Sequence, residues 1–192
     1  MNLHLNNAGW TGVVLAGGRS SRMGRDKALI EIGGRTLLQR ALDTLAPHVD
    51  ELLVIGDPEK YGHVAARVVA DDIPGVGPLG GITTAMRHAQ HARLLVLACD
   101  MPHITSRLVE RLKEGLTGDR SAFVPACDGQ VEPLAAAYHR QCLSVFEDHV
   151  HRRALKLQDA LEAAGATFVQ ICPGEDGWSV DLFRNINAPG DL

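Results

Sequence analysis

A cluster of small residues and cations near the start of the chain has the composition and spacing of a phosphate-binding loop. Ala16, Gly17 and Gly18 follow a short apolar run that ends at Leu15. Glycine lets the backbone approach a bulky group closely, and backbone N–H groups in such a loop donate to phosphate oxygens. Four cationic side chains follow within nine residues: Arg19, Arg22, Arg25 and Lys27. This pattern predicts a binding site for a polyphosphate.

Two better-known glycine motifs fit this chain less well. The P-loop requires Gly-Lys-Ser/Thr after four spacer residues, whereas five residues separate Gly18 from Gly24, and Arg25 follows. The stretch from Gly75 to Gly80 has the Gly-x-Gly-x-x-Gly spacing of dinucleotide-binding folds. However, four residues separate it from the preceding apolar run, and Pro78 removes an N–H donor. A nicotinamide-dependent oxidoreductase therefore stays a distant alternative.

Carboxylates end two of the apolar runs further along the chain. Asp100 comes directly after the apolar residues 94–99, where a carboxylate is well placed to hold Mg²⁺ beside bound phosphates. Asp71 and Asp72 follow another apolar run and could contact a base, a ribose or a second metal ion. Ligands of parallel α/β sheets bind beyond the carboxyl ends of the strands. We therefore expect these carboxylates and the glycine loop to converge on one site.

The glycine loop also carries a family resemblance. Residues 15–27 read L-A-G-G-R-S-S-R-M-G-R-D-K, which resembles a signature of nucleotidyltransferases, and most closely that of the molybdenum cofactor guanylyltransferases. Four further segments resemble motifs of the same family in the same order: G-P-L-G-G at 77–81, C-D-M-P at 99–102, E-P-L at 132–134 and N-I-N-A-P-G-D-L at 185–192. The resemblance implies a Mg²⁺-dependent transfer of GMP from GTP to molybdopterin, with release of pyrophosphate.

The resemblance assigns roles in nucleotide binding and catalysis. Asp100 would hold the metal, and Asp71, rather than Asp72, would contact the nucleotide. Lys27 is the expected cation for the charge that develops when the acceptor attacks the α-phosphorus, and Arg22 would share that role or bind the acceptor. The catalytic set is thus Lys27, Arg22 and Asp100. The expected nucleotide-binding residues are Leu15, Ala16, Gly17, Gly18, Lys27, Asp71, Gly77, Pro78, Leu79 and Asp100, with Gly77, Pro78, Leu79 and Gly81 forming a wall against the guanine ring.

Acceptor-binding residues are expected in the second half of the chain. Glu132 belongs to the E-P-L segment that the resemblance places there. Asn185 and Asn187 lie two residues apart, so on an extended segment they share one face and could hydrogen-bond a pterin edge. Arg152 and Arg153 are candidates for the acceptor's phosphate, with a solvated surface pair as the alternative.

The chain departs from the family pattern at two places that bear on the site. Ala188 stands where a threonine is usual, and the asparagine often found after the second strand is replaced in the stretch Ile55-Gly56-Asp57. Asp57 is the candidate substitute for that base contact.

The hydrophobic pattern alternates between strand and helix periods. Alternating strands and helices indicate right-handed βαβ units, so we predict an α/β fold. The expected architecture is a Rossmann-like three-layer sandwich with a mostly parallel central sheet, of the nucleotide-diphospho-sugar transferase type. Strands are expected at 13–15, 52–55, 67–70, 94–98, 122–125, 134–138 and 168–171, with extended pieces at 28–32 and 181–187 and a hairpin turn at 127–130. Helices are expected at 36–47, 59–65, 82–91, 105–115, 140–150 and 155–164.

Length and composition limit the domain organisation and the partners. The 192 residues predict a single domain. The resemblance implies that it is a nucleotidyltransferase domain, with a GTP-binding half at about 1–104 and an acceptor-binding half at about 105–192. A net charge of −4 and an aromatic content of 4% disfavour a nucleic-acid partner. Residues 1–40 nevertheless hold six Lys or Arg against two Asp or Glu, an excess that suits a small polyanion.

The distribution of cysteines and apolar residues bears on localisation. No two of the four cysteines are closer than fifteen residues, which predicts buried thiols in a reducing compartment. The sequence lacks both a long apolar run and a leader pattern. We therefore expect a cytoplasmic protein without membrane contact. The cysteines are Cys99, Cys127, Cys142 and Cys172.

Alternatives remain open at this stage. The same chemistry with CTP, or with a sugar phosphate as acceptor, occurs on related folds. A non-catalytic nucleotide-binding adapter is a more distant alternative, and it would bind nucleotide without releasing pyrophosphate. GTP and molybdopterin are the expected substrates, with transient contact to other proteins of cofactor synthesis or molybdoenzyme maturation as a further expectation.

Overall fold

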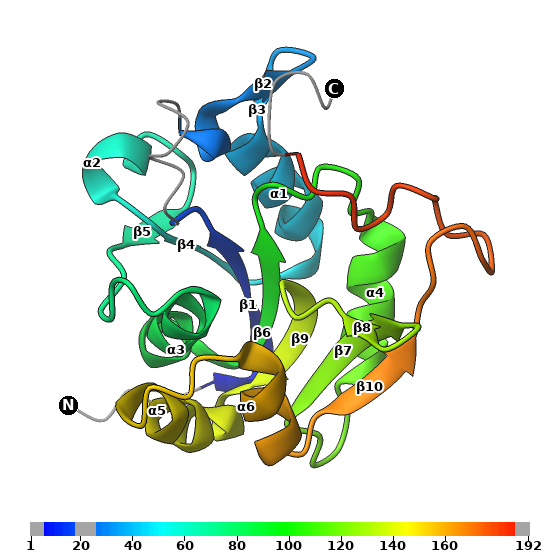
Figure 1. The fold of residues 1–192 in the computed structure, drawn as a ribbon. Coiled ribbons are helices and arrows are strands. Elements are labelled where there is room, and N and C mark those ends of the chain that lie inside the picture. The colour runs from blue at the N-terminus through cyan, green and yellow to red at the C-terminus, as the bar shows by residue number, and fades with distance from the viewer. Residues whose placement is uncertain (1–5, 18–25, 187–192) are drawn as a thin grey trace.

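The computed structural model describes residues 6–17 and 26–186, and Figure 1 shows their arrangement. The strands of the central sheet are β1 (Asn6–Leu15), β4 (Glu51–Ile55), β5 (Arg67–Val69), β6 (His91–Ala98), β7 (Ala122–Cys127), β8 (Gln130–Val131), β9 (Ala135–His139) and β10 (Thr167–Gln170). Two further strands, β2 (Glu31–Ile32) and β3 (Arg35–Thr36), form a separate antiparallel hairpin.

The central sheet is mostly parallel, as predicted. Its strand order in the described residues is β10-β7-β9-β6-β1-β4-β5, with β8 paired to β7. The strands β5, β4, β1 and β6 pair in parallel, and so do β10 and β7. Only β9 on this path runs the opposite way, because it is antiparallel to both of its neighbours, β6 and β7.

Helices cover both faces of the sheet and make three layers (Figure 1). One face packs against α1 (Leu37–Leu45) and α4 (Ser106–Gly115). The other packs against α3 (Pro78–His88), α5 (Leu143–His151) and α6 (Leu157–Ala163). The remaining short helices are α2 (Pro58–Tyr61) and the 3-10 turns η2 (Lys27–Leu29), η3 (Ala46–His48) and η4 (Arg140–Cys142).

The alternation of side chains along the central strands explains why both faces are apolar. Val14 packs with the cluster of α1 and α4, whereas its neighbours Val13 and Leu15 pack with the cluster of α3. All three are buried, as expected for a strand with helices on both sides. β1 and β6 thus run through the middle of the core and deliver their carboxyl ends, Leu15 and Ala98, side by side.

The helix α3 begins four residues earlier than predicted. The pattern predicts a loop through residue 81, because Pro78, Gly80 and Gly81 are poor helix formers. In the structure Pro78 occupies the first helical turn, where its missing N–H costs nothing, and Gly77 precedes it with φ +73°. A side chain at Gly80 would collide with Val76 Cγ2 and the Ile73 carbonyl, so close packing requires this glycine.

Other segments also differ from the prediction. Residues 28–32 divide into η2 and β2, and α2 ends at Tyr61 rather than at 65. The short β8 directly follows the turn at 127–130, and the returning strand expected at 134–138 is β9, which is antiparallel to β7 as predicted. Residues 181–183 form a turn, and none of the described residues 181–186 belongs to a strand.

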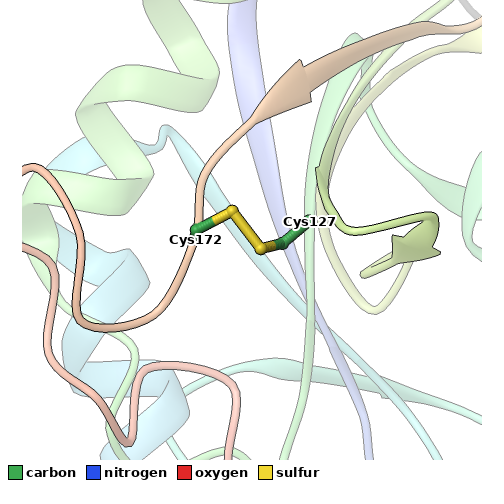
Figure 2. Close-up of a disulfide and its surroundings, with 2 residues drawn as sticks. All are labelled: Cys127 and Cys172. Atoms are coloured by element: carbon green, nitrogen blue, oxygen red, sulfur yellow. A yellow bond between two sulfur atoms is a disulfide. The ribbon is translucent and has the colours of Figure 1, made fainter.

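Two of the four cysteines form a disulfide, which corrects the prediction of four buried thiols. Cys127 at the end of β7 is bonded to Cys172 just after β10 (Figure 2). The two strands are parallel neighbours, and the Ile171 N–H donates to the Ala126 carbonyl at 3.1 Å. The fold therefore brings together two cysteines that are 45 residues apart in the sequence. Cys99 and Cys142 are free and buried, as expected.

Candidate active site

A cavity of about 1160 Å³ lies beyond the carboxyl ends of β1, β4, β5 and β6. This is the edge at which open α/β sheets bind ligands, and the cavity is large enough for a nucleotide. β1 contributes the residues at its end and β6 those around Asp100, while the turn into α3 forms another wall. The lining residues are Leu15, Ala16, Gly17, Lys27, Ala28, Ile55, Gly56, Asp57, Pro58, Ala70, Asp71, Pro74, Gly75, Gly77, Pro78, Gly81, Ala98, Cys99, Asp100 and Leu134.

Lys27 and Asp100 face each other in this cavity, although 73 positions separate them in the sequence. Lys27 Nζ lies 3.8 Å from Asp100 Oδ2, and both side chains are about one quarter exposed. Burial raises the pKa of Asp100 above its usual value, although the positive charge of Lys27 opposes that shift. The raised pKa means that the ionised carboxylate is under-solvated, a state that favours binding of a cation.

Local structure fixes the position of Lys27. Asp26 precedes the 3-10 turn η2, and its Oδ1 accepts a hydrogen bond from the Ala28 N–H at 3.1 Å. The carboxylate of Asp26 also accepts from the Tyr61 hydroxyl at 2.7 Å. The end of β1 is fixed separately, because the Ala16 N–H donates to the Ile55 carbonyl at 2.9 Å.

The carboxylate oxygens of the cavity suit magnesium better than a metal ion whose ligands all come from the protein. Within residues 6–17 and 26–186, no group of three or more His, Cys, Asp or Glu side chains is arranged to hold a metal ion. Asp100 lies beside the cation of Lys27, in a cavity that is also lined by Asp57 and Asp71. Mg²⁺ commonly binds through one or two carboxylates and completes its octahedron with water and substrate phosphates. Asp100 therefore fits an ion that is shared with a bound phosphate chain.

The two adjacent aspartates at 71 and 72 point to different surroundings. Asp71 lines the cavity, and its Oδ1 accepts from the Ile73 N–H at 3.0 Å and from the Thr84 hydroxyl at 2.9 Å. Asp72 instead lies against α3, with its Oδ2 3.1 Å from His88 Nε2 and 3.6 Å from Arg87 Nη1. Only Asp71 is placed to meet a ligand in this cavity.

The Gly-Pro-Leu segment is divided between the cavity and the core. Gly77, Pro78 and Gly81 line the cavity. Leu79 is fully buried in the core cluster on the α3 face of the sheet, so its side chain forms no part of the wall expected against a base. The helical repeat explains the division, because Leu79 points from α3 towards the sheet.

A second, smaller cavity of about 490 Å³ lies in the other half of the chain. Glu132 is the one predicted acceptor-binding residue in its lining, and burial raises the pKa of its carboxyl. Leu134 lines the larger cavity, so the Glu-Pro-Leu segment extends from one cavity to the other. The smaller cavity is lined by Cys127, Asp128, Gln130, Glu132, Pro173, Val180, Asp181, Phe183 and Arg184.

The remaining predicted acceptor residues have different positions. The Ile186 N–H donates to the Asp100 carbonyl at 2.9 Å, which brings the exposed Asn185 close to the strand end that carries Asp100. Arg152 ends α5 as an exposed residue and pairs with Asp148 at 2.9 Å, and Arg153 adopts φ +58° after it. Neither arginine lines either cavity. The predicted site residues Gly18, Arg22 and Asn187 lie outside the described residues.

The sequence reading missed several residues at the site. Pro58, Pro74 and Leu134 line the cavity without any chemical signature. Tyr61 does not line it, yet its hydroxyl bonds Asp26 and approaches the Ala16 carbonyl at 3.2 Å. In the sequence, Tyr61 stands out only as an aromatic residue at the end of a short polar helix. Asp57, the candidate substitute for an absent asparagine, does line the cavity.

Comparisons with known proteins agree with this geometry. The sequence model of the family described as MobA-like NTP transferase domain matches residues 12–167. A probable molybdenum cofactor guanylyltransferase of Pelotomaculum thermopropionicum is 36% identical over 184 residues, which cover 95% of this chain and 89% of the relative. That of Bacillus subtilis is 34% identical over 186 residues, covering 94% and 91%.

Solved structures show the same fold. The molybdopterin-guanine dinucleotide biosynthesis protein A of Archaeoglobus fulgidus gives a TM-score of 0.79 at 27% identity, with 94% of each chain covered. The 2-C-methyl-D-erythritol 4-phosphate cytidylyltransferase of Thermus thermophilus gives 0.66 at 20% identity, with 93% of each chain covered. The second likeness concerns the fold alone.

A mostly parallel sheet whose strand ends border a nucleotide-sized cavity, with a lysine and a carboxylate inside it, suits the binding of a nucleotide and the stabilisation of charge on its phosphates. The chain belongs to the MobA-like NTP transferase family, as the sequence resemblance predicts, and it is a nucleotidyltransferase. No helix in the described part of the chain is long and apolar enough to cross a membrane.

Proposed function

We propose that the protein transfers GMP from GTP to molybdopterin, forming molybdopterin guanine dinucleotide and pyrophosphate with Mg²⁺. The observation that carries the proposal is the Lys27–Asp100 pair, 3.8 Å apart in the large cavity. Relatives that cover nearly the whole chain are named molybdenum cofactor guanylyltransferases, which supports the choice of base and acceptor.

The reaction requires no covalent enzyme intermediate. An oxygen of the acceptor phosphate attacks the α-phosphorus of GTP, a new P–O bond forms, and the bond to the β-phosphate oxygen breaks. The Lys27 ammonium offsets the charge that develops on the phosphate oxygens, and it does so from a preformed position. Because the Ala16 N–H is already bonded to Ile55, the backbone donors available to the phosphates begin at Gly17.

Asp100 would hold the magnesium ion, which supplies positive charge to the phosphates when bound. Its carboxylate is partly desolvated and lies opposite Lys27, so its negative charge is in a position to attract a cation. Lys27 and the ion would both offset the negative charge of the phosphates.

The nucleotide and the acceptor would occupy the two cavities. Gly77, Pro78 and Asp71 line the part of the large cavity that we assign to the nucleoside. The smaller cavity beside Glu132 is the proposed site of the acceptor's ring system. Asn185 lies between Arg184, which lines this cavity, and Ile186, whose N–H bonds the Asp100 carbonyl. The Glu-Pro-Leu segment between the two cavities would align the acceptor phosphate with the nucleotide.

Calorimetric titration with GTP, CTP, UTP, ATP and NADH, with and without Mg²⁺, tests the nucleotide. We expect selective binding of GTP that strengthens with Mg²⁺. Addition of molybdopterin should then release one pyrophosphate for each dinucleotide formed.

Each other outcome overturns a specific part of the proposal. Selective binding of CTP would overturn the guanine assignment and keep nucleotidyl transfer. GTP binding without pyrophosphate release would favour an adapter, and preferential binding of NADH would reject the reaction altogether.

A further inference from the structure

Tyr61 joins the two chain segments on either side of the cation-rich stretch without lining the cavity. It is the last residue of α2 and is only 2% exposed. Its hydroxyl lies 2.7 Å from Asp26 Oδ2 and 3.2 Å from the Ala16 carbonyl. Ala16 precedes Gly17 at the end of β1, and Asp26 precedes Lys27. One buried hydroxyl therefore contacts both flanks of the proposed phosphate site.

The hydroxyl has one proton to donate, and the carboxylate is the better acceptor. The contact with Asp26 is the shorter of the two, and hydrogen bonds to a carboxylate are stronger than those to a carbonyl. Burial raises the pKa of Tyr61 well above its ordinary value, and the hydrogen bond with Asp26 adds to that effect. The hydroxyl therefore remains a neutral donor throughout the physiological pH range.

The hydrogen bond to Asp26 bears directly on Lys27. Asp26 Oδ2 accepts from Tyr61, while Asp26 Oδ1 accepts from the Ala28 N–H at 3.1 Å. Tyr61 thus holds one oxygen of the Asp26 carboxylate, and the other oxygen caps the first turn of η2, whose first residue is Lys27. Lys27 Nζ in turn reaches Asp100. The contacts form a continuous chain from α2 to the end of β6.

The position of the ring depends on the glycine at 56. A Cβ at Gly56 would lie 2.7 Å from Tyr61 Cε2 and 3.3 Å from Ala16 Cβ. Any side chain there would displace the ring from Asp26. The Ile55-Gly56-Asp57 stretch, which lacks the usual asparagine, thus leaves room for the ring of Tyr61.

We propose that Tyr61 is a positioning residue that sets the reaction geometry by holding Asp26, and through it Lys27. The inference rests on the proposed transfer at the large cavity. Misplacement of a charge-stabilising group by a fraction of an ångström lowers the rate of the chemical step more than it lowers substrate binding. Tyr61 would therefore influence kcat without touching the substrate.

Tyr61→Phe tests this directly, because it keeps the ring and removes only the hydroxyl. We expect kcat for pyrophosphate release to fall about tenfold while KM for GTP changes by less than about twofold. GTP binding by calorimetry should retain the wild-type stoichiometry. A merely structural role would instead lower the fraction of binding-competent protein and leave kcat per bound site unchanged, which would overturn the proposal.

Tyr138→Phe provides the matched control for stability. Tyr138 is the other tyrosine of the chain. It is also fully buried, and its hydroxyl donates to the Pro133 carbonyl at 2.6 Å. The melting temperatures of the two variants should each fall by only about 2–4 °C. A much larger fall for Tyr61→Phe alone would assign its hydroxyl to folding.

A double-mutant cycle with Asp26→Asn decides whether Tyr61 acts through Asp26. If it does, Asp26→Asn alone lowers kcat to a similar extent, and the double variant is no slower than Asp26→Asn. If the effects of the two substitutions on kcat multiply instead, Tyr61 does not act through Asp26, and the proposal is overturned. Asp26→Asn also keeps the proposal testable should Tyr61→Phe fail to fold. Absence of turnover in the wild-type protein would reject the proposed function instead, and turnover selective for CTP would move the same comparison to CTP.

Discussion

The carboxylate of Asp100 combines a functional position with an unfavourable environment. It is partly buried, and its pKa is raised because burial penalises the charged form. A group with a raised folded-state pKa contributes most stability below its unfolded pKa and loses that contribution as pH rises through the folded value. At neutral pH the ionised Asp100 therefore costs stability, and its proposed role in binding a cation would offset that cost.

Asp100→Asn should separate these two effects. We expect turnover to fall by at least about 100-fold, because charge stabilisation at the phosphates is lost. The melting temperature at pH 7 should stay the same or rise, since the buried charge is removed. Pyrophosphate release and thermal unfolding on the same preparation check both results. Near-normal turnover in the folded variant would contradict the role of Asp100.

The adjacent aspartates offer a matched pair for nucleotide binding. Asp71→Asn should weaken GTP binding about tenfold, because a charged hydrogen-bond acceptor is lost from the cavity. Asp72→Asn should leave affinity at the wild-type value, since Asp72 faces His88 and Arg87 instead. Calorimetric titration of both variants distinguishes them. Equal losses would contradict the assignment of Asp71 to the nucleotide.

At the residue scale, the sequence predicts the part of the site that is chemically unusual. Asp71 and Asp100 stand out by charge at the ends of apolar runs, and Lys27 is the last of the four cations that follow the glycine loop. All three line one cavity. The prediction that the Leu79 side chain lies in the wall against the base is wrong, because the orientation of that side chain depends on where α3 begins. The link between Tyr61 and Asp26 spans 35 positions and depends on packing that a local pattern does not contain.

At the scale of elements, Glu51 connects the four parallel strands at the edge opposite the cavity. Its carboxylate accepts from the Thr11 hydroxyl of β1 at 2.7 Å, from Arg67 of β5 at 2.6 Å and from the Gln90 N–H before β6 at 2.7 Å. Burial would raise the pKa of Glu51, but the hydrogen bonds from Gln90, Arg67 and Thr11 outweigh it and leave the pKa below its usual value.

Glu51→Gln should destabilise the protein by about 1–3 kcal/mol at pH 7, because Arg67 loses its charged partner. A lowered folded-state pKa gives stability that is present above the unfolded pKa and is lost as pH falls through the folded value. The difference from wild type should therefore shrink below about pH 4.3. Urea unfolding across pH measures it, with the exposed Glu110→Gln as control. A pH-independent difference would contradict this account.

Elements with a clear period were predicted correctly, and those set by packing were not. Thr36 caps α1 as expected, accepting from the Gln39 N–H at 3.1 Å. The start of α3 was missed because Gly80 and Gly81 indicate a loop, whereas the structure needs them for close contacts with Val76 and Leu15. The antiparallel direction of β9 relative to β7 is indicated by the hairpin turn expected at 127–130 and is confirmed. The pairing of β9 with β6 on its other side joins distant segments, and no local pattern carries that information.

At the scale of the whole molecule, the Cys127–Cys172 disulfide fastens the segment that leads to Asn185. This segment has two further attachments: Arg107 stacks on Trp178 at 4.1 Å, and the Ile186 N–H bonds Asp100. No local pattern indicates the disulfide, because its cysteines become neighbours only through the pairing of β10 with β7.

Replacement of both bonded cysteines by serine should lower the free energy of unfolding by about 2–4 kcal/mol, because the unfolded chain regains the freedom of a 45-residue loop. GTP affinity should remain unchanged, since neither cysteine lines the large cavity. Urea unfolding of wild type with and without dithiothreitol provides the comparison, and reduced wild type should match the variant. Identical unfolding with and without reductant would contradict the disulfide.

The antiparallel strand β9 also determines how the protein can be divided. It pairs with β6 on one side and β7 on the other, so the segments before and after residue 104 share one continuous sheet. A fragment that stopped near residue 104 would leave β6 as a bare edge strand with Leu94–Ala98 unpaired on that side. Exposed apolar edges of this kind pair with other copies and aggregate. An engineered exchange of the proposed acceptor-binding half between relatives would have to keep β9 together with its partner β6. The segment to exchange is therefore one that leaves the whole sheet intact.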